Sequence, residues 1–179
     1  MTSRTVALIG PMGAGKTSIG RRVARRLGVR FVDTDAVIAA EHGPIPHLFE
    51  TVGEGVFRGL ERDVVQRELR TGGVVALGGG AVLDASTRAA LGDCIVVLLT
   101  VSEEAVAARL ESGTRPLLTD GLASWRRIAA EREPLYRDLA DVTVDTSRRP
   151  MTRIAEELAA QLRGAHTDPG ARQQEESGS

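Results

Sequence analysis

The sequence contains little cysteine, few aromatic residues and no long apolar run. Its 179 residues include one cysteine, Cys94, so no disulfide can form within the chain, as is typical of proteins in a reducing cytoplasm. No apolar run approaches the roughly 20 residues that span a membrane. No apolar segment follows a basic N-terminus, so the sequence shows no signal peptide. We therefore expect a cytoplasmic protein that does not enter a membrane.

The chain also lacks an excess of charge of either sign. Its formal net charge is −1, so no overall field draws it to nucleic acid. The three histidines, His42, His47 and His166, show no spacing with cysteines or acids that suggests zinc. The length fits one domain, which we place at residues 1–163, followed by a polar, disordered tail at 164–179.

The most informative stretch is Gly10–Thr17, which reads G-P-M-G-A-G-K-T and matches the phosphate-binding P-loop pattern G-x-x-x-x-G-K-[ST]. Residues 5–9 before it are apolar and β-branched, which is typical of a buried strand. After it, apolar residues recur every four positions at Ile19, Val23 and Leu27, which is typical of an amphipathic helix. A strand before the loop and a helix after it are the context that the motif requires.

The residues of this motif suit a nucleoside triphosphate. Gly10, Gly13 and Gly15 allow a tight turn and let backbone N–H groups approach phosphate oxygens. We expect Lys16 to reach the β- and γ-phosphates, and the Thr17 hydroxyl to bind Mg²⁺. The alternative is an ordinary glycine-rich turn between a strand and a helix, which does not account for the lysine.

Strands and helices alternate along the chain, which indicates an α/β fold. Further strands are expected at residues 31–34, 74–77, 94–100 and 142–144. Helices are expected at residues 35–42, 47–70, 84–91, 102–109, 124–139 and 150–162. This alternation predicts a five-stranded parallel sheet covered by helices on both faces, with ligands beyond the carboxyl ends of the strands. The glycine-rich segment 111–122 is a candidate lid.

Two acids follow the second expected strand. Asp33 and Asp35 flank Thr34, and both carboxylates point to the same side if the segment stays extended. Paired acids beside a nucleotide suit a metal contact and a base for a hydroxyl group. Alternatively, Thr34 or Asp35 caps the helix that follows. P-loop proteins often carry a metal-binding aspartate at the end of another strand, but the strand at 74–77 ends in Gly78–Gly80, which leaves Asp33 as the candidate.

One face of the long expected helix combines acids, an aromatic ring and an arginine. The spacing i, i+3, i+4 and i+7 places on that face Glu54, Phe57, Arg58 and Glu61. The planar guanidinium of Arg58 can bind a substrate carboxylate with two hydrogen bonds. The alternative is an ion pair between Glu54 and Arg58 within the helix, and both interpretations can hold together.

Further arginines lie in or near the candidate lid. Arg115 lies within it, and Arg132 and Arg137 lie on the helix expected at 124–139. Mobile arginines over a transferring phosphoryl group neutralise its charge and exclude water. A lone surface arginine is usually only solvated, so it is the position of Arg115 in the lid that favours a phosphate contact.

Together these motifs resemble those of the shikimate kinase family. The shared segments, in the family's order, are Gly10–Thr17, Asp33–Asp35, Gly53–Glu61, Leu77–Ala81, Arg115–Leu118 and Pro134–Arg137. The P-loop alone does not separate this family from adenylate, gluconate or nucleoside kinases, whereas the combination does. The resemblance implies a three-layer P-loop kinase fold with a mobile lid. It also implies transfer of the γ-phosphate of ATP to the 3-hydroxyl of shikimate, a step towards chorismate and the aromatic amino acids.

The resemblance implies residue roles at the nucleotide. The P-loop residues that would contact ATP are Gly13, Ala14, Gly15, Lys16, Thr17 and Ser18. Arg115 would close over the phosphates, and Arg109 and the Arg149–Pro150 turn would contact adenine. Thr17 and Asp33 would support Mg²⁺, Asp33 mostly through water.

The resemblance also implies roles at the acceptor, within a substrate-binding region at about residues 34–61. Asp35 would bind the substrate hydroxyls and take the proton, which makes it a catalytic residue together with Lys16 and Arg115. Arg58 and Arg137 would grip the carboxylate of shikimate. The residues expected to contact shikimate are thus Asp35, Phe57, Arg58, Gly79, Gly80 and Arg137.

Two rival interpretations stay open at this point. One is another P-loop kinase that phosphorylates a polyol or a sugar acid such as gluconate. The other is a nucleotide-dependent binding or regulatory protein, which would need neither a lid arginine nor an arginine facing a second pocket, and this chain has both in Arg115 and Arg58. Segment 43–49 departs from the family pattern, because it is shorter and lacks the family's serine. We expect a monomer that binds ATP and shikimate and no nucleic acid.

Overall fold

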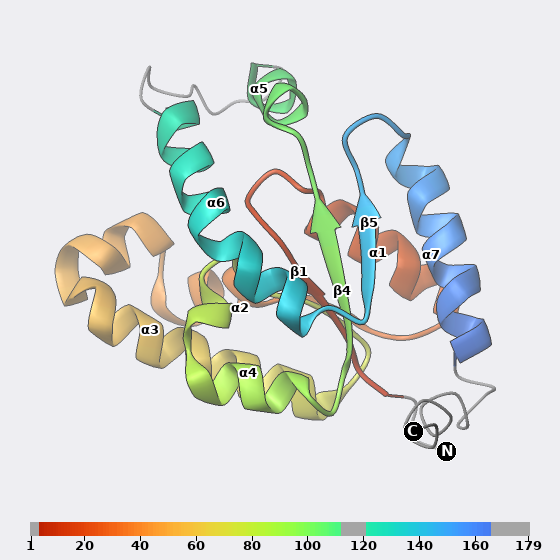
Figure 1. Cartoon of the computed structure of the whole chain (residues 1–179). Coiled ribbons are helices and arrows are strands. Elements are labelled where there is room, and N and C mark those ends of the chain that lie inside the picture. Colours follow the sequence, from red (N-terminus) through yellow and green to blue (C-terminus); the bar gives the residue numbers. More distant parts are fainter. Residues whose placement is uncertain (1–3, 112–120, 166–179) are drawn as a thin grey trace, which may run out of the picture.

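The structure is a computed structural model that describes residues 4–111 and 121–165 (Figure 1). A single sheet runs through its centre, with helices on both sides. Within these two ranges, none of the helices combines the length and the apolar character that crossing a membrane requires.

The sheet has five strands, all parallel, in the order β2-β3-β1-β4-β5. The strands are β1 Val6–Ile9, β2 Phe31–Asp33, β3 Val74–Ala76, β4 Ile95–Thr100 and β5 Val142–Asp145. Strand β1, which leads into the P-loop, lies between β3 and β4. Because all strands are parallel, their carboxyl ends meet at one edge, where such folds bind ligands. The predicted five-stranded parallel sheet is confirmed.

Helices cover both faces of the sheet (Figure 1). The helical segments of the described residues are α1 Lys16–Leu27, α2 Thr34–His42, α3 Ile45–Thr71, the 3₁₀ turn η1 Ala81–Leu83, α4 Ala85–Leu91, α5 Glu103–Glu111, α6 Gly121–Leu139 and α7 Met151–Ala165. Helices α1 and α7 pack on one face of the sheet, and α3, α4 and α6 pack on the other. These three layers are those of the predicted α/β fold.

Alternate residues of the central strand separate the two cores. Val6 and Leu8 of β1 pack towards α1 and α7, whereas Ala7 and Ile9 pack towards α3, α4 and α6. All four are at most 2% exposed. A parallel sheet buried on both faces needs apolar residues on both sides of each strand. This packing fixes the strand ends from which the functional segments leave.

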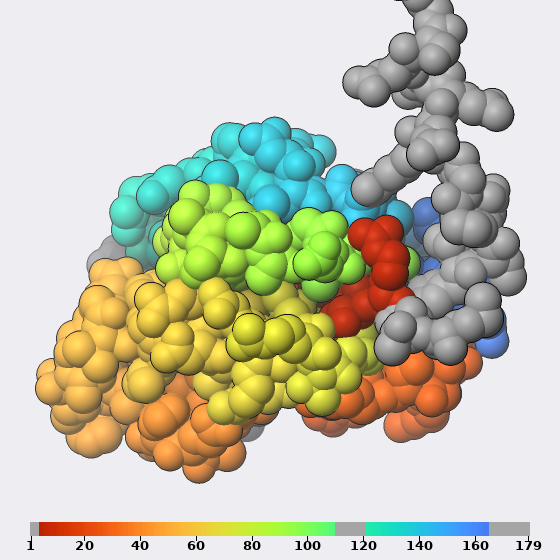
Figure 2. Space-filling view, turned by 90° about the horizontal axis from the view of Figure 1, so that it is seen from below, coloured from red at the N-terminus to blue at the C-terminus, as the bar shows by residue number. Residues whose placement is uncertain are grey.

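The long helix expected at 47–70 is longer than predicted and is interrupted. Helix α3 begins at Ile45, and Pro46 fits in its first turn, where the N–H has no partner within the helix. At Gly53 the backbone leaves the helical region, with φ 78° and ψ 166°. Seen from below, α3 and α4 lie side by side (Figure 2). The break at Gly53 divides α3 into a first segment of about two turns and a longer segment that reaches the sheet.

Two expected boundaries lie at the limits of the described residues. Both ends of the segment 111–122 that was predicted as a lid are helical, because α5 includes Glu111 and α6 begins at Gly121. Arg115 and the remainder of that segment, residues 112–120, lie outside the described residues. Helix α7 continues to Ala165, past the expected start of the tail, and the rest of the tail is also outside the described residues.

Candidate active site

The P-loop leaves β1 at Gly10 and enters α1 at Lys16. Gly10 has a φ of 136°, and a Cβ at this position would overlap the carbonyl oxygen of Leu99. Gly15 has a φ of 90°, and a Cβ there would lie 2.8 Å from Cε of Met151. Only glycine combines this backbone with such close neighbours. The path of the loop is therefore set by the packing of β4 and α7 against it.

Lys16 lies within this turn. Its Nζ donates to the carbonyl oxygens of Gly10 and Pro11, at 2.7 and 3.0 Å. Burial of the ammonium lowers the pKa of Lys16 to about 8, although the nearby carboxylates of Asp35 and Asp33 oppose this shift. The lysine is thus positioned in the predicted phosphate-binding turn and close to both acids.

The two expected Mg²⁺ ligands meet beside Lys16. The Thr17 hydroxyl donates to Oδ2 of Asp33 at 2.5 Å. The other carboxylate oxygen of Asp33 accepts from the N–H groups of Asp35 at 3.0 Å and Ala36 at 3.4 Å. Asp33 is therefore the N-cap of α2, a role that the sequence suggested for Thr34 or Asp35. The segment does not stay extended, because α2 begins directly after Asp33.

Oxygen ligands of this kind fit Mg²⁺. The ion prefers oxygen donors and usually takes one or two carboxylates, with water and phosphate completing its shell. Thr17 and Asp33 supply a hydroxyl and a carboxylate at one point. Over residues 4–111 and 121–165, no group of three or more His, Cys, Asp or Glu side chains could hold a metal ion. Thr17 and Asp33 are thus too few to hold a metal ion alone and fit one that shares its ligands with phosphate.

The glycines that follow β3 form the floor of a second site beside the P-loop. A Cβ on Gly78 would lie 2.5 Å from Oδ1 of Asp35 and 2.9 Å from Oε1 of Glu61. A Cβ on Gly80 would overlap the guanidinium of Arg58. Any side chain at these two positions would push the charged groups away. The glycines therefore allow two carboxylates and a guanidinium to converge on this floor.

Arg58 is held from several sides. Its Nη1 donates to Oε2 of Glu61 at 2.6 Å, and its Nη2 lies 3.6 Å from Oε1 of Glu54. Its guanidinium carbon lies 5.3 Å from the ring centroid of Phe57 and 5.9 Å from that of Phe49. The expected ion pair with Glu54 is present, together with the shorter contact to Glu61. Because a guanidinium has five N–H donors, Arg58 keeps donors for an anion.

Two of the arginines of α6, Arg132 and Arg137, have different surroundings. Nη1 of Arg132 lies 3.5 Å from where a Cβ of Gly79 would be, and its charge acts on both Lys16 and Glu61. Arg137 is 57% exposed and pairs with Glu133, also on α6, at 2.6 Å. Residues five apart on a helix do not share a face. The structure therefore places Arg132 beside the glycine floor and shows Arg137 paired with Glu133, so the role of Arg137 at the carboxylate stays a prediction.

Both carboxyl groups above the floor bind protons more tightly than usual. Burial raises the pKa of Asp35, and the nearby charge of Asp33 raises it further. Burial also raises the pKa of Glu61, against the effect of its hydrogen bond to Arg58. A carboxylate with a raised pKa is better suited to receive a proton from a hydroxyl group.

The residues expected to contact adenine are divided between two places. Arg109, on α5, donates from Nη1 to the carbonyl oxygen of Gly13 at 2.5 Å. Arg149 pairs with Glu157 of α7, and Pro150 precedes the first residue of that helix. The structure thus brings Arg109 against the P-loop and directs the Arg149 side chain along α7.

The remaining P-loop residues also contact other parts of the protein. Ala14 is fully buried, and Gly13 lies against Val106 of α5. The hydroxyl oxygen of Ser18 accepts from Nη1 of Arg22 at 2.5 Å. Gly13 and Ala14 are thus packed against other parts of the protein, whereas Ser18 is bonded within α1.

Three side chains that contact these loops were given no role from the sequence. Trp125 donates from Nε1 to the Met12 carbonyl oxygen at 2.8 Å. The Thr146 hydroxyl donates to the Ala14 carbonyl oxygen at 2.9 Å. The Tyr136 hydroxyl donates to the Gly79 carbonyl oxygen at 2.6 Å. Trp125, Arg132 and Tyr136 are spaced i, i+7 and i+11, so they share one face of α6. This spacing is the signal by which α6 could have been aligned with the site.

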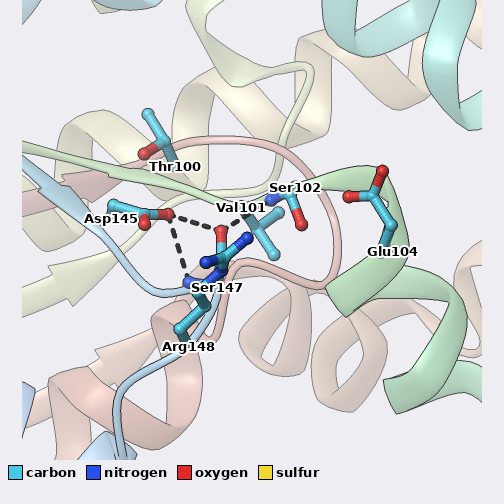
Figure 3. A pocket seen from close by; sticks show the side chains of 7 residues that line it. All are labelled: Thr100, Val101, Ser102, Glu104, Asp145, Ser147 and Arg148. Atoms are coloured by element: carbon cyan, nitrogen blue, oxygen red, sulfur yellow. Dashed lines mark hydrogen bonds between the residues drawn. The ribbon is translucent and has the colours of Figure 1, made fainter.

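An open pocket also lies at the carboxyl ends of β4 and β5 (Figure 3). It is lined by Thr100, Val101, Ser102, Glu104, Asp145, Ser147 and Arg148. The Ser147 hydroxyl donates to Oδ1 of Asp145 at 2.5 Å and accepts from the N–H of Ser102 at 2.8 Å. Asp145, Ser147 and Ser102 are thus bonded to one another at the edge of this pocket.

Comparisons with known proteins match most of this chain. A model of the shikimate kinase family matches residues 12–163. The shikimate kinase of Nitrobacter winogradskyi is 46% identical over 168 residues, which cover 90% of this chain and 78% of the relative. That of Thermobifida fusca is 45% identical over 170 residues, which cover 92% of this chain and 99% of the relative.

Solved structures give the same match. A shikimate kinase from Acinetobacter baumannii in complex with shikimate has a TM-score of 0.83 and 34% identity, and covers 93% of this chain and 97% of its own. A gluconokinase from Sinorhizobium meliloti has a TM-score of 0.66 at 21% identity, so it shares the fold alone.

Proposed function

This chain belongs to the shikimate kinase family, and on that premise we propose how its residues carry out the reaction. It catalyses the ATP-dependent phosphorylation of shikimate, a step of aromatic biosynthesis. Family membership decides against the gluconate kinase and the regulatory protein that the sequence left open. The roles of individual residues follow from where the structure brings them together.

The observation that carries these roles is the set of charges above Gly78–Gly80. Arg58 and Arg132 lie over Gly80 and Gly79, and both are suited to bind the shikimate carboxylate. Arg132 takes the role that the resemblance gave to Arg137, because Arg137 is paired with Glu133 on an exposed part of α6. The ring of Phe57 packs against the guanidinium of Arg58, and the glycines leave room for the ring of the substrate.

Asp35 is the base. Its carboxylate lies over Gly78, between the P-loop lysine and the substrate floor. The oxygen of the 3-hydroxyl forms a bond to the γ-phosphorus of ATP, and the bond from that phosphorus to the β–γ bridging oxygen breaks. Asp35 takes the hydroxyl proton, and ADP leaves with the electron pair. Glu61 keeps Arg58 in place through its hydrogen bond.

The P-loop holds the nucleotide. Lys16 moves its ammonium from the loop carbonyls to the β- and γ-phosphates, and the N–H groups of residues 13–18 point to the phosphate oxygens. Thr17 and Asp33 would hold Mg²⁺, which when bound neutralises the charge that develops on the phosphates. Arg115, outside the described residues, would add a further cation from the lid.

The proposal also covers the domain organisation, the oligomeric state and the location of the protein. We assign residues 1–163 to one catalytic domain, with a polar tail after it. The protein acts as a monomer in the cytoplasm and binds no nucleic acid, in keeping with its net charge of −1.

The experiment is ADP release from Mg-ATP with shikimate, with gluconate as a parallel acceptor. Release that depends on shikimate, with the background rate in gluconate, is the expected result. Equal rates with shikimate, with gluconate and without acceptor would contradict the acceptor pocket and leave the nucleotide site intact.

A further inference from the structure

Three successive carbonyl groups of the P-loop each accept a hydrogen bond from a side chain outside the loop. These carbonyls belong to Met12, Gly13 and Ala14. The donors come from three separate elements, namely α6, α5 and the segment between β5 and α7. In the same order, the donors are Trp125, Arg109 and Thr146.

Trp125 lies near the start of α6. Its indole N–H donates to the Met12 carbonyl oxygen at 2.8 Å, and the residue is only 8% exposed. Met12 itself is 55% exposed. The hydrogen bond therefore holds the backbone of Met12 while its side chain stays at the surface.

Thr146 is fully buried and acts on the peptide after Ala14. Its hydroxyl lies 2.9 Å from the Ala14 carbonyl oxygen and 3.0 Å from that of Thr100, so the two oxygens share one proton. The N–H of Thr146 also donates to the Thr100 carbonyl at 2.9 Å. Strand β4, which ends at Thr100, thus fixes the position of Thr146.

Arg109 and Ser147 complete this support. Arg109 donates to the Gly13 carbonyl oxygen at 2.5 Å, and its guanidinium also donates to the hydroxyl and the carbonyl oxygen of Thr146. Ser147, the next residue, accepts from the N–H of Ser102, as Figure 3 shows. Arg109, Thr146 and the two P-loop carbonyls that they bind therefore form one hydrogen-bond network, and Trp125 binds the same loop one peptide earlier.

The three hydrogen bonds to the P-loop carbonyls also determine where the N–H groups of the loop point. In a trans peptide the C=O and N–H groups point in opposite directions. Holding the three carbonyls on the outer side aims the N–H groups of Gly13, Ala14 and Gly15 to the other side of the loop. Among the described residues, the N–H groups of Gly13 and Gly15 have no acceptor, and that of Ala14 makes a long bond of 3.3 Å to the Pro11 carbonyl. Successive N–H groups arranged in this way bind anions.

We propose that Trp125, Arg109 and Thr146 are positioning residues that hold the P-loop peptides in the orientation that binds phosphate. The inference rests on the nucleotide site of the proposed function, and it gives Arg109 a role in supporting the loop. When one donor is lost, its peptide can rotate and direct a carbonyl oxygen towards the phosphates. The fraction of protein able to bind phosphate then falls, and the apparent affinity falls with it.

Two variants remove one donor each and keep most of the side-chain shape. Trp125→Phe removes the indole N–H, and Thr146→Val removes the hydroxyl. We expect each to weaken binding of Mg-ADP, and of tripolyphosphate, by about tenfold, which corresponds to one lost hydrogen bond. Shikimate binding to the free protein stays within about twofold, because that site is separate. Isothermal titration calorimetry measures all three ligands.

Thr5→Val is the matched control. Thr5 is also a buried threonine, and its hydroxyl donates to the Leu69 carbonyl at 2.9 Å, before β1 rather than after it. This variant loses the same kind of hydrogen bond, so its Tm falls while its affinity for tripolyphosphate stays that of the wild type. Thr146→Ser keeps the hydroxyl and restores the affinity that Thr146→Val loses.

Arg109→Met separates support of the loop from contact with adenine. Tripolyphosphate carries phosphates but no adenosine. Support of the loop predicts equal fold losses for Mg-ADP and tripolyphosphate. A loss confined to Mg-ADP would show that Arg109 contacts adenine and would overturn its place in the network.

Wild-type affinity for tripolyphosphate in Trp125→Phe and Thr146→Val would overturn the inference. An equal loss of affinity in Thr5→Val would also overturn it, because the effect would then be one of general stability. Failure of the wild-type protein to bind Mg-ADP would instead overturn the nucleotide site of the proposed function. The two failures are therefore distinguishable.

Discussion

The nucleotide half and the acceptor half of the active site are built in different ways. In the proposed nucleotide half, the backbone of Gly10–Thr17 would form the binding surface, and side chains from distant elements hydrogen-bond to that backbone. In the acceptor half, the backbone provides a bare floor of glycines, and the charged side chains above it, Asp35, Arg58 and Arg132, are suited to make the contacts themselves.

The surroundings of the two halves differ as well. The P-loop follows the central strand β1. The first segment of α3, near the acceptor, lies between Gly43 and Gly53, which have φ values of 97° and 78°. Its exposed apolar residues are Phe49 and Val52. We therefore propose that phosphate binding depends on a fixed backbone and that acceptor binding depends on individual charges. On this proposal, a single substitution can affect one half alone.

The largest effect is expected from Lys16→Ala. The variant loses both a hydrogen-bond donor and the charge that faces the phosphates, so turnover falls by about 10³-fold or more. Steady-state ADP release measures it. Shikimate binding is retained, as the comparison of the two halves requires, and turnover near that of the wild type would remove Lys16 from the reaction.

Asp35→Asn is expected to reduce kcat by about 10²–10³-fold, because the amide cannot take the hydroxyl proton. The amide has nearly the same shape, so Tm stays close to that of the wild type. Rapid-quench measurement of the phosphoryl transfer step checks this directly. An unchanged kcat would show that another group is the base.

Arg132→Met and Arg137→Met form a matched pair on one helix. Loss of a charge-assisted contact to the shikimate carboxylate raises KM for shikimate by about 10- to 100-fold in Arg132→Met. Arg137 is paired with Glu133 and exposed, so Arg137→Met keeps KM within about twofold. A larger rise in KM for Arg137→Met than for Arg132→Met would show that Arg137 binds the shikimate carboxylate.

The smallest effect concerns pH. Lys16 is the only lysine of the chain, so protein labelled with ¹³C-lysine gives one Cε signal in NMR. Without Mg²⁺, this signal is expected to titrate with the lowered pKa of about 8. Phosphate binds the ammonium form, so the affinity for Mg-free ADP falls by up to about tenfold per pH unit above that value. A titration near 10.5, the ordinary value for lysine, would show that Lys16 is not desolvated.

The nucleotide half could be predicted from the sequence because its signal is local. One stretch, Gly10–Thr17, contains the turn, the lysine and the hydroxyl, and the strand and helix around it follow from apolar spacing. Its support could not be predicted in this way. Trp125 and Thr146 lie 113 and 132 positions from the residues whose carbonyls they bind, and no periodicity links them.

The acceptor half was predicted in part. The spacing of Glu54, Phe57, Arg58 and Glu61 placed them on one face, and these residues do meet around Arg58. The choice between Arg132 and Arg137 depends on how α6 is rotated, which the motif near Pro134 does not fix. The sequence predicted an unbroken helix through Gly53, whereas the helix is interrupted there. A glycine within a helical pattern does not by itself show that the helix breaks.

A crossed titration tests most directly whether the two halves of the active site bind their ligands separately. Mg-ADP and shikimate are each titrated by calorimetry into the wild-type protein, Lys16→Ala and Arg132→Met. We expect Lys16→Ala to lose affinity for Mg-ADP and to keep its affinity for shikimate, and we expect Arg132→Met to do the reverse. An equal loss of affinity for both ligands in either variant would contradict the conclusion that the two halves bind their ligands separately.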